Sequence, residues 1–152
     1  MKKLLSIIVV SLLLSGSANA TMKGIYGVYL LIESLSKHAE NCSLTQQRIE
    51  TAVKYILQNS KIKITEEAHA PLLYIKAVVI KAGDVCTAHT RISLETTLAV
   101  DPYKLENSGR FVFYSDERIT SGGESSTFGD YTIGYIEEMM KELVVKHHED
   151  NW

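Results

Sequence analysis

Apolar and polar positions alternate along two long segments of the chain, Leu72 to Lys81 and Val85 to Leu98. This alternation is typical of strands that bury one face. The Gly83-Asp84 pair between the segments suits a two-residue hairpin turn with glycine at its first central position. The turn predicts a register in which the numbers of paired residues add up to 167. One face is then mostly apolar and is the predicted core face: Leu73, Ile75, Ala77, Val79, Ala88, Thr90, Ile92 and Leu94.

Two other segments, Ser43 to Asn59 and Asp130 to about His148, repeat apolar residues at the three- and four-residue spacing of amphipathic helices. Ser43 and Gln46 form a capping box at the start of the first. Asp130 is a suitable N-cap for the second. The predicted apolar stripes are Ile49, Ala52, Val53, Ile56 and Leu57 in the first helix, and Ile133, Ile136, Met140, Leu143 and Val144 in the second.

Three more segments are rich in β-forming residues and are predicted strands: Gly24 to Ser34, Lys61 to Thr65 and Gly109 to Thr120. The polar or Gly/Ser-rich segments between elements are predicted loops, and the last of them is expected to be mobile: Ser36 to Asn41, Glu66 to Pro71, Asp101 to Asn107 and Ser121 to Thr127. The element order is β-α-β-β-β-β-α. It predicts a two-layer α+β fold, with two helices on a mostly antiparallel sheet of about five strands.

The first residues of the chain have the pattern of a secretory signal peptide. Lys2 and Lys3 are the charged region, Leu4 to Leu14 is the apolar region, and Ala18-Asn19-Ala20 is a small-x-small cleavage site. We therefore expect a signal peptide at 1–20 and a single α+β domain at 21–152, soluble and located in the periplasm or outside the cell. The apolar run is too short for a comfortable membrane span, and no cysteine at the cleavage site offers a lipid anchor.

Charge narrows the choice of partners. Removing the expected signal leaves 14 basic and 18 acidic residues, a formal charge of −4. This acidic balance argues against nucleic acid or an anionic membrane surface as the main partner.

The two cysteines, Cys42 and Cys86, are predicted to form a disulfide, because an even count in an oxidising compartment favours pairing. Cys42 lies just before the first long helix and Cys86 lies on the predicted core face. A thiol–histidine pair with His89 is the alternative. The odd spacing of Cys86 and His89 places them on opposite faces of a strand, so the disulfide is favoured.

The second face of the hairpin is the candidate site for a ligand or a partner. The register places Lys76 opposite Arg91 and His89 opposite Val78, and Tyr74 shares this face. Like charges directly opposite each other are destabilising unless something compensates them. Glu95 could compensate, an anionic ligand could do so, or the side chains could simply extend into water. Three less polar residues suggest that the C-terminal helix or another chain covers part of the face: Tyr74, Val78 and Ile80.

Other candidate chemistry is weak. His147 to Asp150 project in different directions from a helix and do not converge on a metal ion, so a frayed polar tail is favoured. The Ser121 to Ser126 segment lacks the Gly-Lys-Ser/Thr ending of a phosphate loop. No residue is assigned a catalytic role, and no metal or cofactor is expected.

Several segments together resemble a loosely defined group of small exported bacterial proteins of unknown function. They are the helix Leu44 to Leu57 with the short strand after it, Pro71-Leu72-Leu73-Tyr74-Ile75 and the hairpin it opens, Thr127-Phe128-Gly129, and Lys141-Glu142-Leu143 in the last helix. The resemblance spans most of the expected mature chain. It implies export and offers no catalytic residues.

These observations favour a binding protein over an enzyme. The leading hypothesis is a periplasmic module that binds another envelope protein or assists envelope assembly. The alternative is a binder of small anionic ligands, or an accessory hydrolase, that uses the cationic face of Lys76, His89 and Arg91. A homo-oligomer with a structural role is the third possibility.

Overall fold

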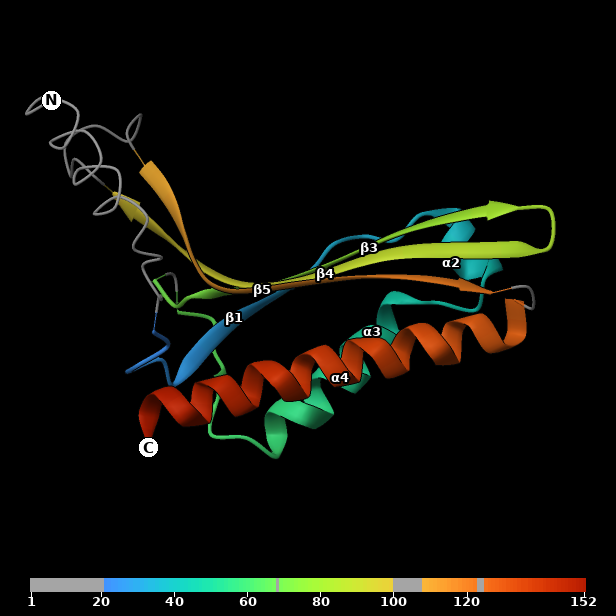
Figure 1. Cartoon of the computed structure of the whole chain (residues 1–152). Coiled ribbons are helices and arrows are strands. Elements are labelled where there is room, and N and C mark those ends of the chain that lie inside the picture. The colour runs from blue at the N-terminus through green and yellow to red at the C-terminus, as the bar shows by residue number, and fades with distance from the viewer. Residues whose placement is uncertain (1–20, 68, 100–107, 123–124) are drawn as a thin grey trace, which may run out of the picture.

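A five-stranded sheet with helices packed beneath it organises the computed structural model (Figure 1). The structure describes residues 21–67, 69–99, 108–122 and 125–152. The expected signal peptide at 1–20 and the predicted loop at 101–107 lie outside these residues. The sheet and helices confirm the predicted α+β class with five strands.

The strands are β1 (Gly27–Ile32), β2 (Lys63–Ile64), β3 (Leu72–Ala82), β4 (Val85–Ala99) and β5 (Ser108–Gly122). Their order across the sheet is β2-β1-β3-β4-β5. β3, β4 and β5 pair antiparallel, but β1 is parallel to both β2 and β3, so the sheet is mixed. A parallel pair needs a crossover between its strands. A helix of the lower layer provides that crossover between β1 and β2.

The predicted hairpin register is confirmed from one end to the other. Leu72 pairs with Glu95 and Ala82 pairs with Val85. Gly83 in the turn has a φ of 60°, a conformation that glycine adopts without the penalty of a Cβ. All eight residues of the predicted core face are buried, because α3 (Gln46–Gln58) and α4 (Ser125–Asn151) cover that face. We call this the inner face.

The helix beginnings differ from the sequence prediction. α3 is capped by Thr45, whose hydroxyl accepts a hydrogen bond from the N–H of Arg48 at 3.3 Å. The predicted capping box at Ser43 is wrong, since Ser43 has a positive φ two residues before the cap. A short helix, α2 (Lys37–Asn41), occupies a segment predicted as a loop. It is too short and polar for a periodic pattern, yet it buries Ala39.

α4 begins before Asp130, so the predicted N-cap lies inside the helix and pairs with Arg48 of α3 instead. The predicted Gly/Ser loop is also largely wrong: Ser121 and Gly122 end β5, and Ser125 to Thr127 belong to α4. The central pair, 123–124, lies outside the described residues. Gly129 allows α4 to approach the segment before α3 closely, because a Cβ there would lie 2.2 Å from the carbonyl oxygen of Ser43.

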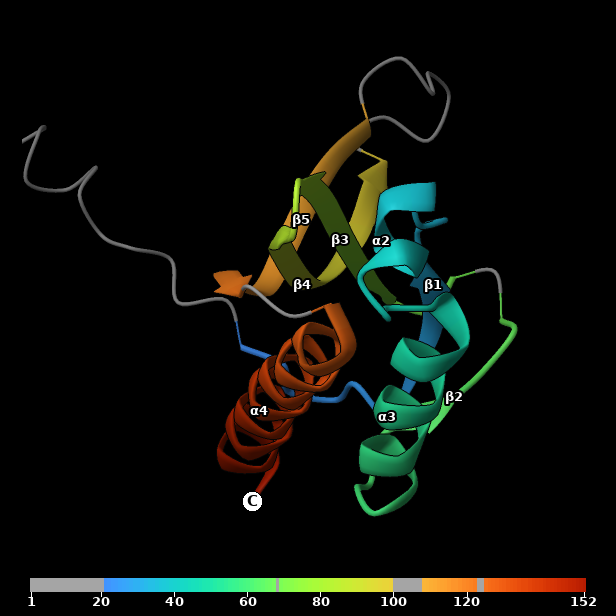
Figure 2. The same ribbon diagram turned by 90° about the vertical axis from the view of Figure 1, so that its right-hand side faces the viewer.

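Covalent and ionic links attach the helical layer to the sheet. A disulfide joins Cys42 at the end of α2 to Cys86 on β4, with the two Cα atoms 6.1 Å apart. Arg118 of β5 donates to Glu138 at 2.6 Å and to Glu142 at 2.7 Å, both on α4. The helices and the apolar core thus lie on one face of the sheet. Among the described residues, no helix lies on the opposite face (Figure 2).

Candidate functional site

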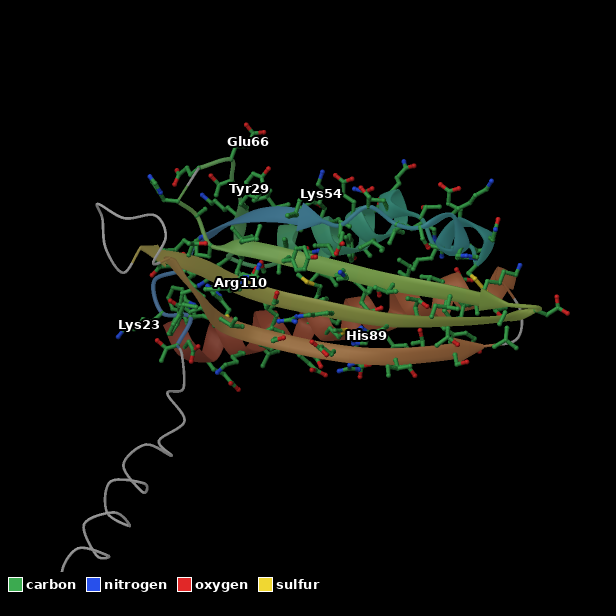
Figure 3. All side chains as sticks on the ribbon, turned by 90° about the horizontal axis from the view of Figure 1, so that it is seen from above. Lys23, Tyr29, Lys54, Glu66, His89 and Arg110 are labelled. Carbon is green, nitrogen blue, oxygen red and sulfur yellow. A yellow bond between two sulfur atoms is a disulfide. The ribbon has the colours of Figure 1, made fainter. Side chains whose placement is uncertain are left out.

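The uncovered side of the sheet, which we call the outer face, holds the residues singled out from the sequence. Tyr74, Lys76, His89 and Arg91 all lie on it. The expectation that the C-terminal helix covers part of this face is wrong, because α4 packs on the inner face through residues such as Ile136 and Met139. Figure 3 looks onto the outer face and shows His89 lying well along the sheet, away from Arg110.

A row of four charged side chains crosses the outer face, and we call it the ionic row: Glu33, Lys76, Arg91 and Glu117. Lys76 lies opposite Arg91 as predicted, and Arg91 lies opposite Glu117 of β5. The Lys76 amine is 3.2 Å from a Glu33 carboxylate oxygen, and the Arg91 guanidinium is 3.4 Å from Glu117. The two adjacent cations are therefore compensated from both sides by carboxylates.

Glu33 lies directly after β1 and is held in place by two donors. The hydroxyl of Tyr74 donates to one of its oxygens, and the Lys76 amine donates to the other at 3.3 Å. The Tyr74 hydrogen bond, and then the Lys76 hydrogen bond, lower the pKa of the Glu33 carboxyl. The same hydrogen bond to Glu33 raises the pKa of Tyr74. Each cation of the row thus has a carboxylate partner on the same face.

His89 shares Glu117 with Arg91, at 3.3 Å between its Nε2 and a carboxylate oxygen. It lies opposite Val78, as the register predicts. The thiol–histidine alternative fails in the structure, because Cys86 is in the disulfide and is fully buried on the inner face.

Exposed apolar side chains gather on the outer face at the hairpin-turn end of the sheet. Ile80 is 62% exposed and Ile119 is 75% exposed. Val78 and Val85 are also exposed on this face, and the outward-facing Thr87 and His89 of β4 lie between the β3 residues and Ile119 of β5. We call the two isoleucines and two valines the apolar patch. Large apolar side chains that are mostly exposed gain free energy when a partner covers them.

A cleft of about 480 Å³ opens at the opposite end of the outer face. The segment after β2 contributes Glu66 to its lining, β1 contributes Tyr29, and β4 and β5 contribute Glu95 and Arg110. Glu95 does not compensate Arg91 as considered from the sequence. Its carboxylate instead lies 3.4 Å from the Arg110 guanidinium, after a register shift between Leu94 and Glu95 in the pairing with β5.

Sequence reasoning missed Glu33, Glu117 and Arg110. Each comes from a strand or strand end whose pairing partner is far away in the sequence, so its place beside the hairpin could not be derived locally. Glu95 was considered as a partner for Arg91, but the burial of its side chain was not predicted. The signal that could have found it is a charged residue at a central position of a strand that is otherwise rich in buried residues.

The end of the chain is ordered instead of frayed. His147 is buried and its ring contacts the carbonyl oxygen of Ile25. Asp150 accepts a hydrogen bond from the N–H of Met22 at 2.7 Å, and the Lys61 amine lies over the Trp152 ring, 3.2 Å from its centroid. Within the described ranges, no group of three or more histidine, cysteine or acidic residues is placed to hold a metal ion. No helix there is long and apolar enough to cross a membrane.

Comparison with known proteins adds little to this geometry. No protein-family model matches the chain, and no curated protein matches it. Among solved structures, the chain is similar to a minor lipoprotein from Acinetobacter baumannii, with 11% sequence identity and a TM-score of 0.40. The alignment covers 80% of this chain and 90% of that protein. At this level of likeness the function has to be argued from the surface of this chain itself.

Proposed function

We propose that this chain is an exported, non-catalytic module that binds another protein through the outer face of its sheet. The observation that carries the proposal is the apolar patch on a sheet face that no described helix covers. Protein-binding surfaces combine an apolar centre with a polar rim. The apolar patch and the ionic row beside it supply both kinds of residue.

Two features support export. The pattern of the first residues is that of a cleavable signal peptide. The Cys42–Cys86 disulfide fits an oxidising compartment such as the periplasm, where such bonds form and persist. The mature chain would then meet its partner in the cell envelope or outside the cell.

Binding of an anionic ligand is less favoured by the same geometry. Lys76 and Arg91 already contact Glu33 and Glu117, so an anion would have to displace two carboxylates from their partners. Replacing Lys76 and Arg91 by alanine tests this alternative directly. It predicts that anion binding is lost while the protein stays folded, whereas the protein-binding proposal predicts no anion binding to lose.

Photo-crosslinking from defined positions in living cells tests the proposed surface. A photoreactive residue at Ile119 should capture a specific protein. The same residue at Tyr55, exposed on α3 in the helical layer, is the matched control and should not. Ile80→Ser should reduce capture from position 119 without lowering the amount of folded protein. Equal capture from both positions, or capture unaffected by Ile80→Ser, would contradict the proposal.

Capture of a second copy of the chain from position 119 would instead support the homo-oligomer. Light scattering over a range of concentrations separates the two, because a self-associating chain gains mass as its concentration rises and a monomer does not.

A further inference from the structure

A buried carboxylate lies in the lining of the cleft at the end of the outer face. Glu95 is only 2% exposed, although glutamate is rarely buried unless it is paired. Its Oε1 atom makes no hydrogen bond to any residue that the structure describes. Its Oε2 atom receives one long hydrogen bond from the Ser93 hydroxyl, at 3.5 Å. The carboxylate therefore has unused capacity to accept hydrogen bonds inside the cleft.

Arg110 compensates this carboxylate only in part. Its guanidinium is 3.4 Å from Oε1 but does not form a hydrogen bond with it, and its side chain is 63% exposed. A buried charge needs both a close counter-charge and satisfied hydrogen bonds to offset its desolvation. The exposed Arg110 is a loose counter-charge and donates no hydrogen bond to Oε1. Its side chain is free to move toward water.

The rest of the cleft also favours a positive ligand. Glu66 and Glu67 contribute two more carboxylates to the lining, against the guanidinium of Arg110 and the imidazole of His69. Tyr29 adds an aromatic ring, a group that attracts ammonium and guanidinium ions. In Figure 3, Tyr29 and Glu66 lie on one side of this end of the sheet and Arg110 lies on the other.

We infer that this cleft binds an organic cation, an ammonium or guanidinium group on an aliphatic chain, with Glu95 as its principal acceptor. The N–H donors of the ligand would bond to Oε1, and Arg110 would move out to the water it already contacts. In the free protein Arg110 thus occupies part of the ligand's place. The cation could belong to a free amine or to a basic side chain of another protein.

The inference stands apart from the proposed protein-binding surface. The apolar patch lies at the hairpin-turn end of the sheet, and the cleft lies at the other end, where Leu72 pairs with Glu95. Small-molecule probes test the cleft without any partner protein, so either proposal can fail while the other holds.

Isothermal titration of the disulfide-bonded protein with three small molecules tests the chemistry. Nα-acetyl-arginine amide represents a basic side chain, cadaverine represents a free amine, and Nα-acetyl-citrulline amide is the uncharged match for the first. We expect at least one of the cations to bind and citrulline amide to bind about tenfold more weakly than arginine amide or not at all. Binding of arginine amide alone assigns a basic side chain as the source, and binding of cadaverine alone assigns a free amine. Failure of both cations to bind, or equal binding of arginine and citrulline amides, overturns the inference.

Two variants with opposite expected effects keep the test independent of folding. Glu95→Gln should weaken cation binding about tenfold or more, because it removes the acceptor charge. Arg110→Ala should tighten binding about threefold, because it removes the competing cation. Glu50→Gln is the matched control: it makes the same change of charge on α3, outside the cleft and the outer face, and should leave affinity unchanged. Unchanged affinity in Glu95→Gln, or lost binding in Arg110→Ala, overturns the inference even if the other variant fails to fold.

Discussion

The inner and outer faces of the sheet are built from alternate residues of the same strands, but they are stabilised differently. Ile92 and Leu94 on the inner face are fully buried against the helices. Arg91, which directly precedes Ile92 in the chain, belongs to the ionic row on the outer face and remains accessible to water. Successive side chains of a strand point to opposite faces, so the same strand can contribute both to the core and to the surface. The inner positions determine the fold, and the outer positions are free to carry a binding surface.

Loss of the disulfide should have the largest effect on the inner face. Replacing Cys42 and Cys86 together by alanine should lower the free energy of unfolding by about 4 kcal/mol, because the bridge closes a long loop in the unfolded chain. Urea unfolding of the oxidised protein and of the variant measures the difference. The mass of the intact protein after reduction and alkylation should show two additional modified thiols. Two thiols that react before reduction would contradict the bridge.

A matched pair of isoleucines sharpens the comparison of the faces. Ile92→Ala should cost about 3 kcal/mol, because it leaves a cavity in the core. Ile119→Ala should cost less than about 0.5 kcal/mol, since this side chain is mostly in water. Both values come from denaturant unfolding of the same oxidised preparation. A comparable cost at the two positions would mean that something covers the outer face in solution.

The hairpin is the part of the fold that sequence predicts best. Its register follows from the Gly83-Asp84 turn and from alternation, both local signals, and every pair from Leu72–Glu95 to Ala82–Val85 agrees. The place of β1 in the sheet has no local signal, because its partners β2 and β3 lie beyond a helix in the chain. The early start of α4 was missed for another reason. Ser125 to Gly129 are poor helix formers, so the local sequence favours a loop where the structure continues α4.

The candidate site could be predicted only in part for the same physical reason. Lys76 and Arg91 face each other because one turn sets their register. The carboxylates that compensate them, Glu33 and Glu117, come from the two flanking strands, and those pairings depend on tertiary structure. Glu95 shows the limit most clearly, since its neighbour Arg110 comes from β5 and the pairing with β5 includes a register shift. The local sequence is enough to predict that the two cations share a face. Whether carboxylates already occupy them depends on strand pairing between distant segments.

The smallest expected effect tests whether the ionic row is ordered in solution. Because the pKa of Glu33 is lowered in the folded protein, its contribution to stability is present above the pKa of the unfolded chain and is lost as the pH falls through the folded value. Tyr74→Phe removes the largest cause of the lowered pKa, so the Glu33 carboxyl should titrate at a higher pH and lose part of this dependence. Carboxyl chemical shifts followed by NMR through acid titration measure it. Tyr55→Phe, an exposed tyrosine on α3, is the control and should leave the Glu33 titration unchanged. An identical Glu33 titration in wild type and Tyr74→Phe would show that the Tyr74–Glu33 hydrogen bond does not persist in water.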